Sequence, residues 1–261
     1  MSMLPNPTFN QTRVLVMLIA FAAAEPSAFA AGPAPKADRS QAEVQIGLCS
    51  PIEHIVQALN LRPRAAAPIE AWQFDDPGIN LLARGLRFRL RAAADGRAEL
   101  TLKVANQDCA RFDAKLATSG KGKCEYDVYG TTTAGTVSLT SKLDARSTGE
   151  LLAGRVALAN ALSPSQIRYL REMVGVWPLP DDIRKLGPMQ VRTYRTAGGL
   201  YDVDISHLPN GERYAEISAK VALPDASSTM EIMKAELQRA GVEMCVDQSS
   251  QAANKLRSLL R

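Results

Sequence analysis

The chain is poor in the residues and motifs by which many active sites are recognised. It holds only two histidines, His54 and His207, and neither stands among residues that suggest a serine–histidine–aspartate triad or a zinc site. No pair of its four cysteines forms a Cys-x-x-Cys motif, which argues against a zinc or redox site. A Walker-type phosphate loop and a Rossmann glycine fingerprint are both absent. Function must therefore be sought in other patterns.

Long runs of charge of one sign are also missing. The 261 residues include 31 Lys and Arg against 27 Asp and Glu, a net charge of +4, and the basic residues do not form blocks. Such a mildly basic chain has no strong attraction to nucleic acid, so no nucleic-acid partner is expected. Its length and its 46% apolar residues suit one globular domain with a substantial core.

The longest apolar run is too short to span a bilayer. It covers residues 14–24, follows an arginine, and is followed by an Ala-Phe-Ala sequence that ends at Ala30. This order of features is typical of a secretory signal peptide, the alternative being a membrane anchor or a buried helix. The predicted parts are a cleavable signal peptide at 1–30, a Pro/Ala-rich linker at 31–41 and a single domain at 42–261. Export is therefore expected, to a bacterial periplasm, with no membrane contact after cleavage.

The even number of cysteines agrees with export, because two disulfides are expected in an exported chain of this kind. Cys109 and Cys124 flank a Gly/Lys/Ser-rich turn and could link the strands of a hairpin. That pairing would leave Cys49 for Cys245 and would tie an early segment to a late one. Four cysteines allow three pairings, and the sequence does not choose among them.

The most informative segment is a strictly alternating stretch near residue 88. Leu86, Phe88 and Leu90 would lie on one face of a strand, and the other face would carry Arg87, Arg89 and Arg91. Guanidinium groups about 7 Å apart along one face repel one another. Such a row needs either open water or a polyanion, and the pattern therefore indicates a phosphate-binding surface.

Similar alternation recurs along the chain. Strands are predicted at 43–48, 69–74, 85–91, 98–104, 124–129, 136–143, 189–195, 200–206 and 214–221, and helices at 50–59, 147–160, 163–174, 227–240 and 249–260. At least six strands carry one apolar and one charged face. An open antiparallel sheet with one solvated side would explain this pattern. The interpretation we favour is a closed barrel whose apolar faces lie outward under helices and whose charged faces line a tunnel.

Three segments resemble the CYTH family, the triphosphate tunnel metalloenzymes. Phe74-Asp-Asp-Pro77, with Leu81 to Arg89, is similar to the family's second strand, turn and third strand. Glu99-Leu-Thr-Leu-Lys103 resembles the next strand, and Tyr214-Ala-Glu-Ile-Ser-Ala-Lys220 resembles a late one. The resemblance covers about residues 42–245. It implies an α+β fold in which a closed antiparallel β-barrel forms a tunnel with helices packed outside.

The resemblance also implies a triphosphate-type ligand and one or two Mg2+ or Mn2+ ions. The implied phosphate-binding residues are Arg87, Arg89, Lys103, Arg192 and Lys220. The implied catalytic carboxylates are Glu43, Glu125 and Glu216. The implied metal ligands are Glu125, Asp127, Glu216 and Asp204.

The sequence departs from the family pattern in its acidic half. The opening Glu-x-Glu-x-Lys motif is here Glu43-Val-Gln45-Ile-Gly47, and Ser218 stands where a carboxylate is often found. Loss of anionic ligands weakens divalent-cation binding. The chain is therefore expected either to bind polyphosphate-type anions without efficient turnover or to hydrolyse tripolyphosphate with a metal. The third hypothesis is a structural or interaction protein on a degenerate fold. The oligomeric state stays open.

Overall fold

A computed structural model describes residues 41–261, apart from 95, 113–114, 116–121, 249–250 and 261. The predicted signal peptide and residues 31–40 of the predicted linker lie outside the described residues. Gln41, the last residue of that predicted linker, is the first residue of a strand. None of the described helices is long and apolar enough to cross a membrane.

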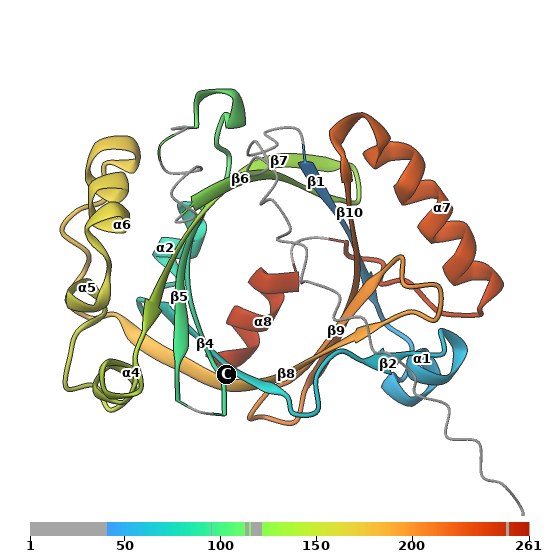
Figure 1. Cartoon of the computed structure of the whole chain (residues 1–261), viewed down its shortest axis with the longest axis horizontal. Helices are drawn as coiled ribbons and strands as arrows, with labels where there is room; N and C mark the ends of the chain where they lie inside the picture. The colour runs from blue at the N-terminus through green and yellow to red at the C-terminus, as the bar shows by residue number, and fades with distance from the viewer. Residues whose placement is uncertain (1–40, 95, 113–114, 116–121, 249–250, 261) are drawn as a thin grey trace, which may run out of the picture. The chain divides into compact units, whose positions relative to one another are not determined.

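Nine strands form a closed barrel, and a short tenth strand, Arg62–Pro63, pairs with the end of one of them. In chain order they are β1 (Gln41–Leu48), β2 (Arg62–Pro63), β3 (Ile69–Asp75), β4 (Leu86–Ala92), β5 (Ala98–Val104), β6 (Gly122–Tyr129), β7 (Thr132–Leu143), β8 (Arg184–Arg195), β9 (Asp202–His207) and β10 (Arg213–Ala222). Their order around the sheet is β8-β3-β4-β5-β7-β6-β1-β10-β9, and a β8–β9 pairing closes the ring (Figure 1). The expected tunnel barrel is thus confirmed.

One pair of strands corrects the expectation that all pairs are antiparallel. β1 runs parallel to β6, with Ala42 beside Tyr126 and Gln45 beside Tyr129, whereas the other pairs are antiparallel. Parallel neighbours need a long crossover connection. The four strands between β1 and β6, with their loops, form this crossover connection, which a short hairpin loop could not provide.

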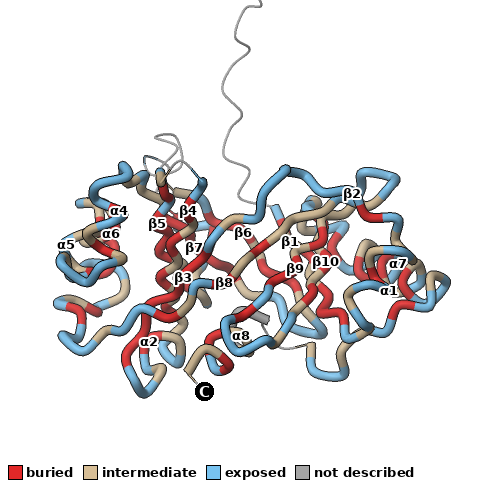
Figure 2. Tube along the Cα trace, turned by 90° about the horizontal axis from the view of Figure 1, so that it is seen from below, coloured by how far each residue is buried: buried red, intermediate tan, exposed pale blue. Residues whose placement is uncertain are grey.

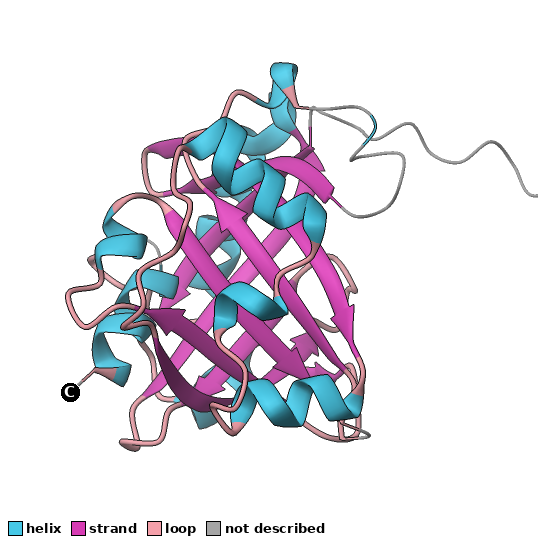
Figure 3. Cartoon of the chain, turned by 90° about the vertical axis from the view of Figure 1, so that its left-hand side faces the viewer, coloured by secondary structure: helices cyan, strands magenta, loops and turns pink. Residues whose placement is uncertain are grey.

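Helices cover the outside of the barrel. They are α1 (Ile52–Ala58), α2 (Asn80–Ala83), α4 (Ala145–Leu152), α5 (Leu158–Ala161), α6 (Pro164–Tyr169) and α7 (Ala226–Arg239). Figure 3 shows helices lying across the outer face of the strands. The capping box that starts α6 forms, with Ser163 and Gln166 bonded reciprocally. The single helix predicted at 147–160 is instead α4 and α5, because the chain turns at Gly154, whose φ is +71°.

The barrel buries the apolar faces of its strands outward, against these helices. Leu86, Phe88 and Leu90 of β4 have no exposed surface and belong to a cluster under α4, α5 and α6. A second cluster, which includes Val44 and Met233, joins β1, β9 and β10 to α1 and α7 (Figure 2). Each fully buried side chain of this size contributes roughly 1.5–3 kcal/mol to folding. On the strands of these two clusters, the burial fixes which face must point inward.

The last helix, α8 (Gln251–Leu259), departs from the expectation that the helices pack outside. Figure 1, viewed along the barrel, shows α8 within the ring of strands, and Figure 2 places it near one end. Leu259 packs against Ala71, Met189 and Val191, which are apolar residues on the inner faces of β3 and β8. The helix therefore occupies part of the barrel's interior.

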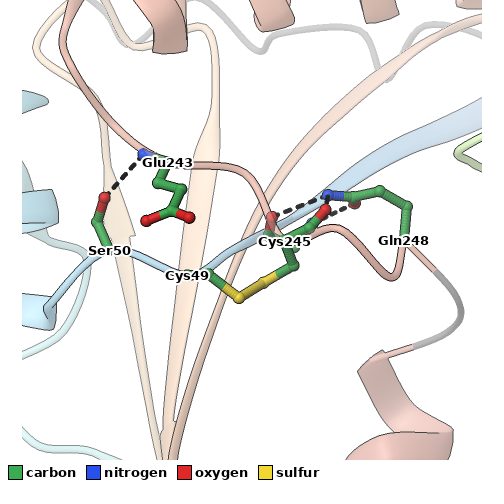
Figure 4. Close-up of a disulfide and its surroundings, with 6 residues drawn as sticks. Cys49, Ser50, Glu243, Cys245 and Gln248 are labelled. Carbon is green, nitrogen blue, oxygen red and sulfur yellow. Dashed lines mark hydrogen bonds between the residues drawn. A yellow bond between two sulfur atoms is a disulfide. The ribbon is translucent and has the colours of Figure 1, made fainter.

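Both disulfides considered from the sequence are present. Cys109 and Cys124 are linked across 15 residues, and Cys49 and Cys245 across 196. The second disulfide joins the end of β1 to the segment that leads into α8 (Figure 4). The backbone N–H of Cys245 also donates to the carbonyl of Gly47 at 2.9 Å. The start of the chain's last segment is therefore fixed to the barrel.

Candidate functional site

The inside of the barrel holds a charged cavity, here called the tunnel cavity, of about 410 Å3. Its basic lining residues are Arg64, Arg87, Arg89, Arg91, Lys103, Lys123, Lys220 and Lys255. Its acidic lining residues are Glu43, Glu99, Asp202, Asp204 and Glu216. A second cavity of similar volume shares Gln45 and Arg87 with it and extends toward α2.

The basic wall of the tunnel cavity is formed by β4 and β5. Their register places Arg87 directly opposite Lys103, whereas Arg91 lies opposite Glu99. Like charges directly opposite each other on a sheet are destabilising. The Arg87–Lys103 pair is therefore unfavourable unless negative charge lies beside it. Asp127, 3.7 Å from Arg87, supplies part of that charge, and a bound anion would supply more.

Arg89 lies between Arg87 and Arg91 on the same strand face. Burial, with the charges of its two neighbours, lowers the pKa of Arg89 to about 9. The Nε atoms of Arg89 and Arg91 are buried and have no hydrogen-bond partner among the described residues. Guanidinium groups bind phosphate oxygens through paired, charge-assisted hydrogen bonds. These two free donors are therefore available to a phosphate group inside the barrel.

Lys103 adds a titratable cation to the wall. Burial and, after it, the charge of Arg87 lower the pKa of Lys103. The carboxylate of Asp127 opposes this shift only in part, and the resulting pKa is about 8. An anion bound in the tunnel cavity would stabilise the ammonium form. The charge of this wall, and with it the anion affinity, therefore depends on pH in the mildly alkaline range.

The affinity for a phosphate polyanion is expected to fall as the pH rises from 7.5 to 9.5, on the order of tenfold. Lys103 loses its proton near pH 8 in the folded protein but only near 10.5 when unfolded. The unfolded chain thus holds more protons in this window, and the contribution of Lys103 to the free energy of unfolding rises with pH. Calorimetric titration with tripolyphosphate and denaturant unfolding would measure the two opposite trends. Lys103→Met should remove the part of both trends near pH 8 and leave the part that Arg89, with a pKa of about 9, contributes; equal pH profiles in the two proteins would contradict this assignment.

The carboxylates on β6 are bound by cations of the chain itself. Glu125 forms ion pairs with Lys123 and with Lys220, whose Nζ lies 3.1 Å from Glu125 Oε1. Burial opposes ionisation of Glu125, but the two ammonium groups outweigh it and hold the pKa of Glu125 below its usual range. Asp127 Oδ2 lies 3.7 Å from Arg87 Nη2. Both predicted metal ligands on this strand therefore already have cationic partners.

A second acidic group lies on β9 and β10. Glu216 and Asp204 are direct cross-strand neighbours, and both line the tunnel cavity. Asp204 Oδ1 accepts a hydrogen bond from the Thr193 hydroxyl at 2.5 Å, and Asp204 Oδ2 lies 3.9 Å from Arg91 Nη2. Burial raises the pKa of Glu216, an effect that Lys255 opposes and Asp204 reinforces. Two adjacent carboxylates in a buried site attract a proton or a cation.

Comparison with known proteins identifies the fold. No family model and no curated protein matches the sequence. A candidate adenylyl cyclase from Hippeastrum, described as having a dominant triphosphatase activity, aligns with a TM-score of 0.57 and 17% identity over 83% of this chain and 95% of its own. A candidate adenylate cyclase from Bacillus halodurans aligns with a TM-score of 0.54 and 12% identity over 82% and 98%. The chain has the CYTH-type tunnel fold.

The CYTH-type fold brings most of the predicted site residues together. The tunnel cavity is lined by Glu43, Arg87, Arg89, Lys103, Asp204, Glu216 and Lys220. Asp127 lines the second cavity. Glu125 forms an ion pair with Lys220, which lines the tunnel cavity. Fold does not determine activity, so the roles of these residues stay predictions.

Arg192 is the exception among the predicted phosphate-binding residues. On β8 the residues that line the tunnel cavity are Met189, Val191 and Thr193, and the side chains of a strand alternate between its faces. Arg192 therefore lies on the outer face of the barrel. Tyr194, two residues further along the same face, packs against the outer apolar cluster that includes Val44 and Met233. The structure corrects its assignment to the tunnel.

The arrangement of the carboxylates does not fit the implied divalent-metal centre. Gln45 and Ser218, two of the positions that lack the family's charge, pair directly across β1 and β10 and both line the tunnel cavity. Among the described residues, no three Asp, Glu, His or Cys side chains gather closely enough to hold a metal ion. Mg2+ and Mn2+ depend on several oxygen ligands with negative charge. The neutral pair thus interrupts the acidic half of the tunnel.

Four basic residues of the tunnel cavity are absent from the predicted site, namely Arg64, Arg91, Lys123 and Lys255. Arg91 continues the alternation of Arg87 and Arg89, so the sequence contained its signal. Lys123 stands at the end of the Gly/Lys/Ser-rich segment that the sequence predicts to be a turn, but it lies on β6 and forms an ion pair with Glu125. Lys255 belongs to α8, and helical periodicity alone cannot show that this helix enters the barrel.

Proposed function

We propose that the protein binds short inorganic phosphate polyanions, such as tripolyphosphate, inside the tunnel cavity. The observation that carries this proposal is the pair of buried, unpartnered Nε–H groups of Arg89 and Arg91 within a wall of mutually repelling cations. A phosphate chain would satisfy the donors and neutralise the charge together. The triphosphatase activity described for the Hippeastrum protein of the same fold supports a ligand of this class.

The acidic half of the tunnel supports binding more than metal-assisted hydrolysis. Glu125 and Asp127 are paired with cations, and Gln45 and Ser218 are neutral where charge would be needed. Phosphoryl transfer depends on positioning and on neutralising charge, and cations alone can hold a phosphate chain without activating water. The basic wall thus supports binding by itself, and binding needs no contribution from the carboxylates.

Metal-dependent hydrolysis of tripolyphosphate is the second candidate function. It is favoured by the adjacent carboxylates of Glu216 and Asp204, which face the same cavity as the basic wall. If Mg2+ or Mn2+ binds in this protein, these two residues are the place where it would do so, close to the bound anion.

One experiment distinguishes the two functions. The protein, purified with its disulfides oxidised, would be titrated with tripolyphosphate in chelator, in Mg2+ and in Mn2+, while released phosphate is measured in the same samples. Binding with chelator present and without phosphate release is the expected result. Release that requires metal and is lost in Glu216→Gln would establish the hydrolase instead. Absence of binding under every condition would refute both and would leave the interaction-protein hypothesis.

We also propose that the mature protein is exported, with residues 1–30 as the removed signal peptide and 42–261 as a single domain. Two disulfides among the four cysteines support an oxidising compartment, for which the bacterial periplasm is our proposal. Mass spectrometry of the secreted or periplasmic protein would test this directly. The expected N-terminus is Ala31, and an intact N-terminus would contradict the proposal.

A further inference from the structure

The helix α8 brings a cation into the tunnel cavity from the far end of the chain. Leu259 of α8 packs on Met189 and Val191 inside the barrel. The hydroxyl of Ser258 lies 2.6 Å from the hydroxyl of Tyr214, and its carbonyl accepts from the Asn210 amide at 3.2 Å. These contacts fix the last turn of α8 on the inner surface of the barrel.

Lys255, one turn before Leu259, lines the tunnel cavity together with the residues of both its walls. Glu216 and Asp204 line the same cavity, where their charges favour the ammonium form of Lys255, whereas the charges of Arg89 and Arg91 disfavour it. Burial lowers the pKa of Lys255, and these two carboxylates act against that shift. A half-buried ammonium group that lines the same cavity as acidic and basic groups can offset the carboxylates and donate hydrogen bonds to a phosphate group.

A tether holds α8 in this position. Residues just before the helix are linked to the end of β1 by the Cys49–Cys245 disulfide. The Gln248 amide oxygen accepts from the backbone N–H of Gly47 at 2.8 Å, and its amide nitrogen donates to the Gly47 carbonyl at 3.2 Å. Ser50 Oγ accepts from the N–H of Glu243 (Figure 4). Contacts as far as Gln248, together with those of the helix's last turn, therefore hold α8 and with it Lys255 in place.

The strand to which this tether is attached supplies no basic side chain of its own to the lumen. The inward positions of β1 hold Glu43 and Gln45, followed by Gly47. On the neighbouring strand β10, Lys220 is the basic residue that lines the tunnel cavity, and it forms an ion pair with Glu125. Asp204 has Arg91 at 3.9 Å, but Glu216 has no ion pair among the described residues, so without α8 its carboxylate would have no cation of its own to offset it against a bound anion.

We propose that Lys255 is an anion-binding residue of the tunnel and that its ammonium group balances Glu216 and Asp204 in place of a divalent cation. This inference rests on the proposed polyanion binding and explains how that binding can proceed without metal. The positive charge that a metal ion would bring is supplied by the polypeptide. Its site is the gap between the acidic pair and the basic wall of β4.

The test measures tripolyphosphate affinity calorimetrically in wild type, Lys255→Gln and Lys255→Arg, each with chelator and with excess Mg2+. Lys234→Gln is the matched control, because Lys234 lies on the outer helix α7 and pairs with Glu231. In chelator, Lys255→Gln is expected to bind tripolyphosphate about tenfold more weakly than wild type, which is the effect of losing one charge-assisted hydrogen bond. Lys255→Arg and Lys234→Gln should bind as wild type does.

Mg2+ gives a second readout that a structural role of α8 would not produce. It should leave wild-type affinity unchanged but strengthen binding by Lys255→Gln, because the acidic pair then has only Arg91, beside Asp204, to offset two carboxylates. Thermal unfolding would show whether each variant is folded, with Lys255→Met as the replacement if Lys255→Gln is not. Equal affinity of wild type and Lys255→Gln in chelator, or a wild type that binds only with Mg2+, would overturn the inference alone. A wild type that binds under no condition would overturn the proposed function as well.

Discussion

Arg89→Gln is expected to weaken tripolyphosphate binding by at least about 100-fold while making the free protein more stable. The guanidinium group lies at the centre of the basic wall, with a buried Nε–H that has no partner among the described residues. Removing a buried cation that is repelled by Arg87 and Arg91 should raise the free energy of unfolding by roughly 1–2 kcal/mol. Calorimetric titration and denaturant unfolding would measure the two effects.

The opposite signs of these effects make the prediction specific. A purely structural arginine would lose stability when truncated, and a residue of a solvated face would change neither quantity by much. Arg192→Gln is the matched control, since it removes the same group from the outer face of the same barrel and should leave affinity unchanged. If Arg192→Gln weakened binding as much as Arg89→Gln does, the tunnel would not be the binding site.

The strands and their inward faces could largely be predicted from alternation. The clearest case is β4, where Leu86, Phe88 and Leu90 had to face a core and the three arginines had to face away from it. Burial of apolar side chains sets the face of a strand, so one face fixes the other. Which strands are neighbours is a different matter, because pairing depends on contacts distant in sequence. The parallel pairing of β1 with β6 belongs to that class.

Arg192 shows where this logic fails and why. On most strands of this barrel the apolar face points outward and the polar face inward. On β8 the inner face is apolar at Met189 and Val191, because Leu259 of α8 covers it. The inner and outer faces of β8 therefore cannot be told apart from composition until the position of α8 is known. The same unknown position concealed Lys255, which the periodicity of its helix could not place.

Loss of the Cys49–Cys245 disulfide is expected to be the most damaging change outside the tunnel. It closes a loop of 196 residues, and loop-closure entropy assigns to it about 5 kcal/mol of stability, against about 3 kcal/mol for the 15-residue loop of Cys109–Cys124. The double variant Cys49→Ser/Cys245→Ser should therefore lower the free energy of unfolding more than Cys109→Ser/Cys124→Ser does. Denaturant unfolding of both variants would measure the difference.

The two disulfides should also differ in their effect on the ligand. Cys49–Cys245 fixes the approach to α8, so its loss removes a constraint on the position of Lys255, whereas Cys109–Cys124 lies away from that helix. Anion affinity in chelator should fall by about tenfold in the first variant, as it does for Lys255→Gln, and stay near wild type in the second. Adding Lys255→Gln to the first variant should then cost little more, because both changes remove one interaction. Additive losses would show that the disulfide stabilises the fold without positioning the cation.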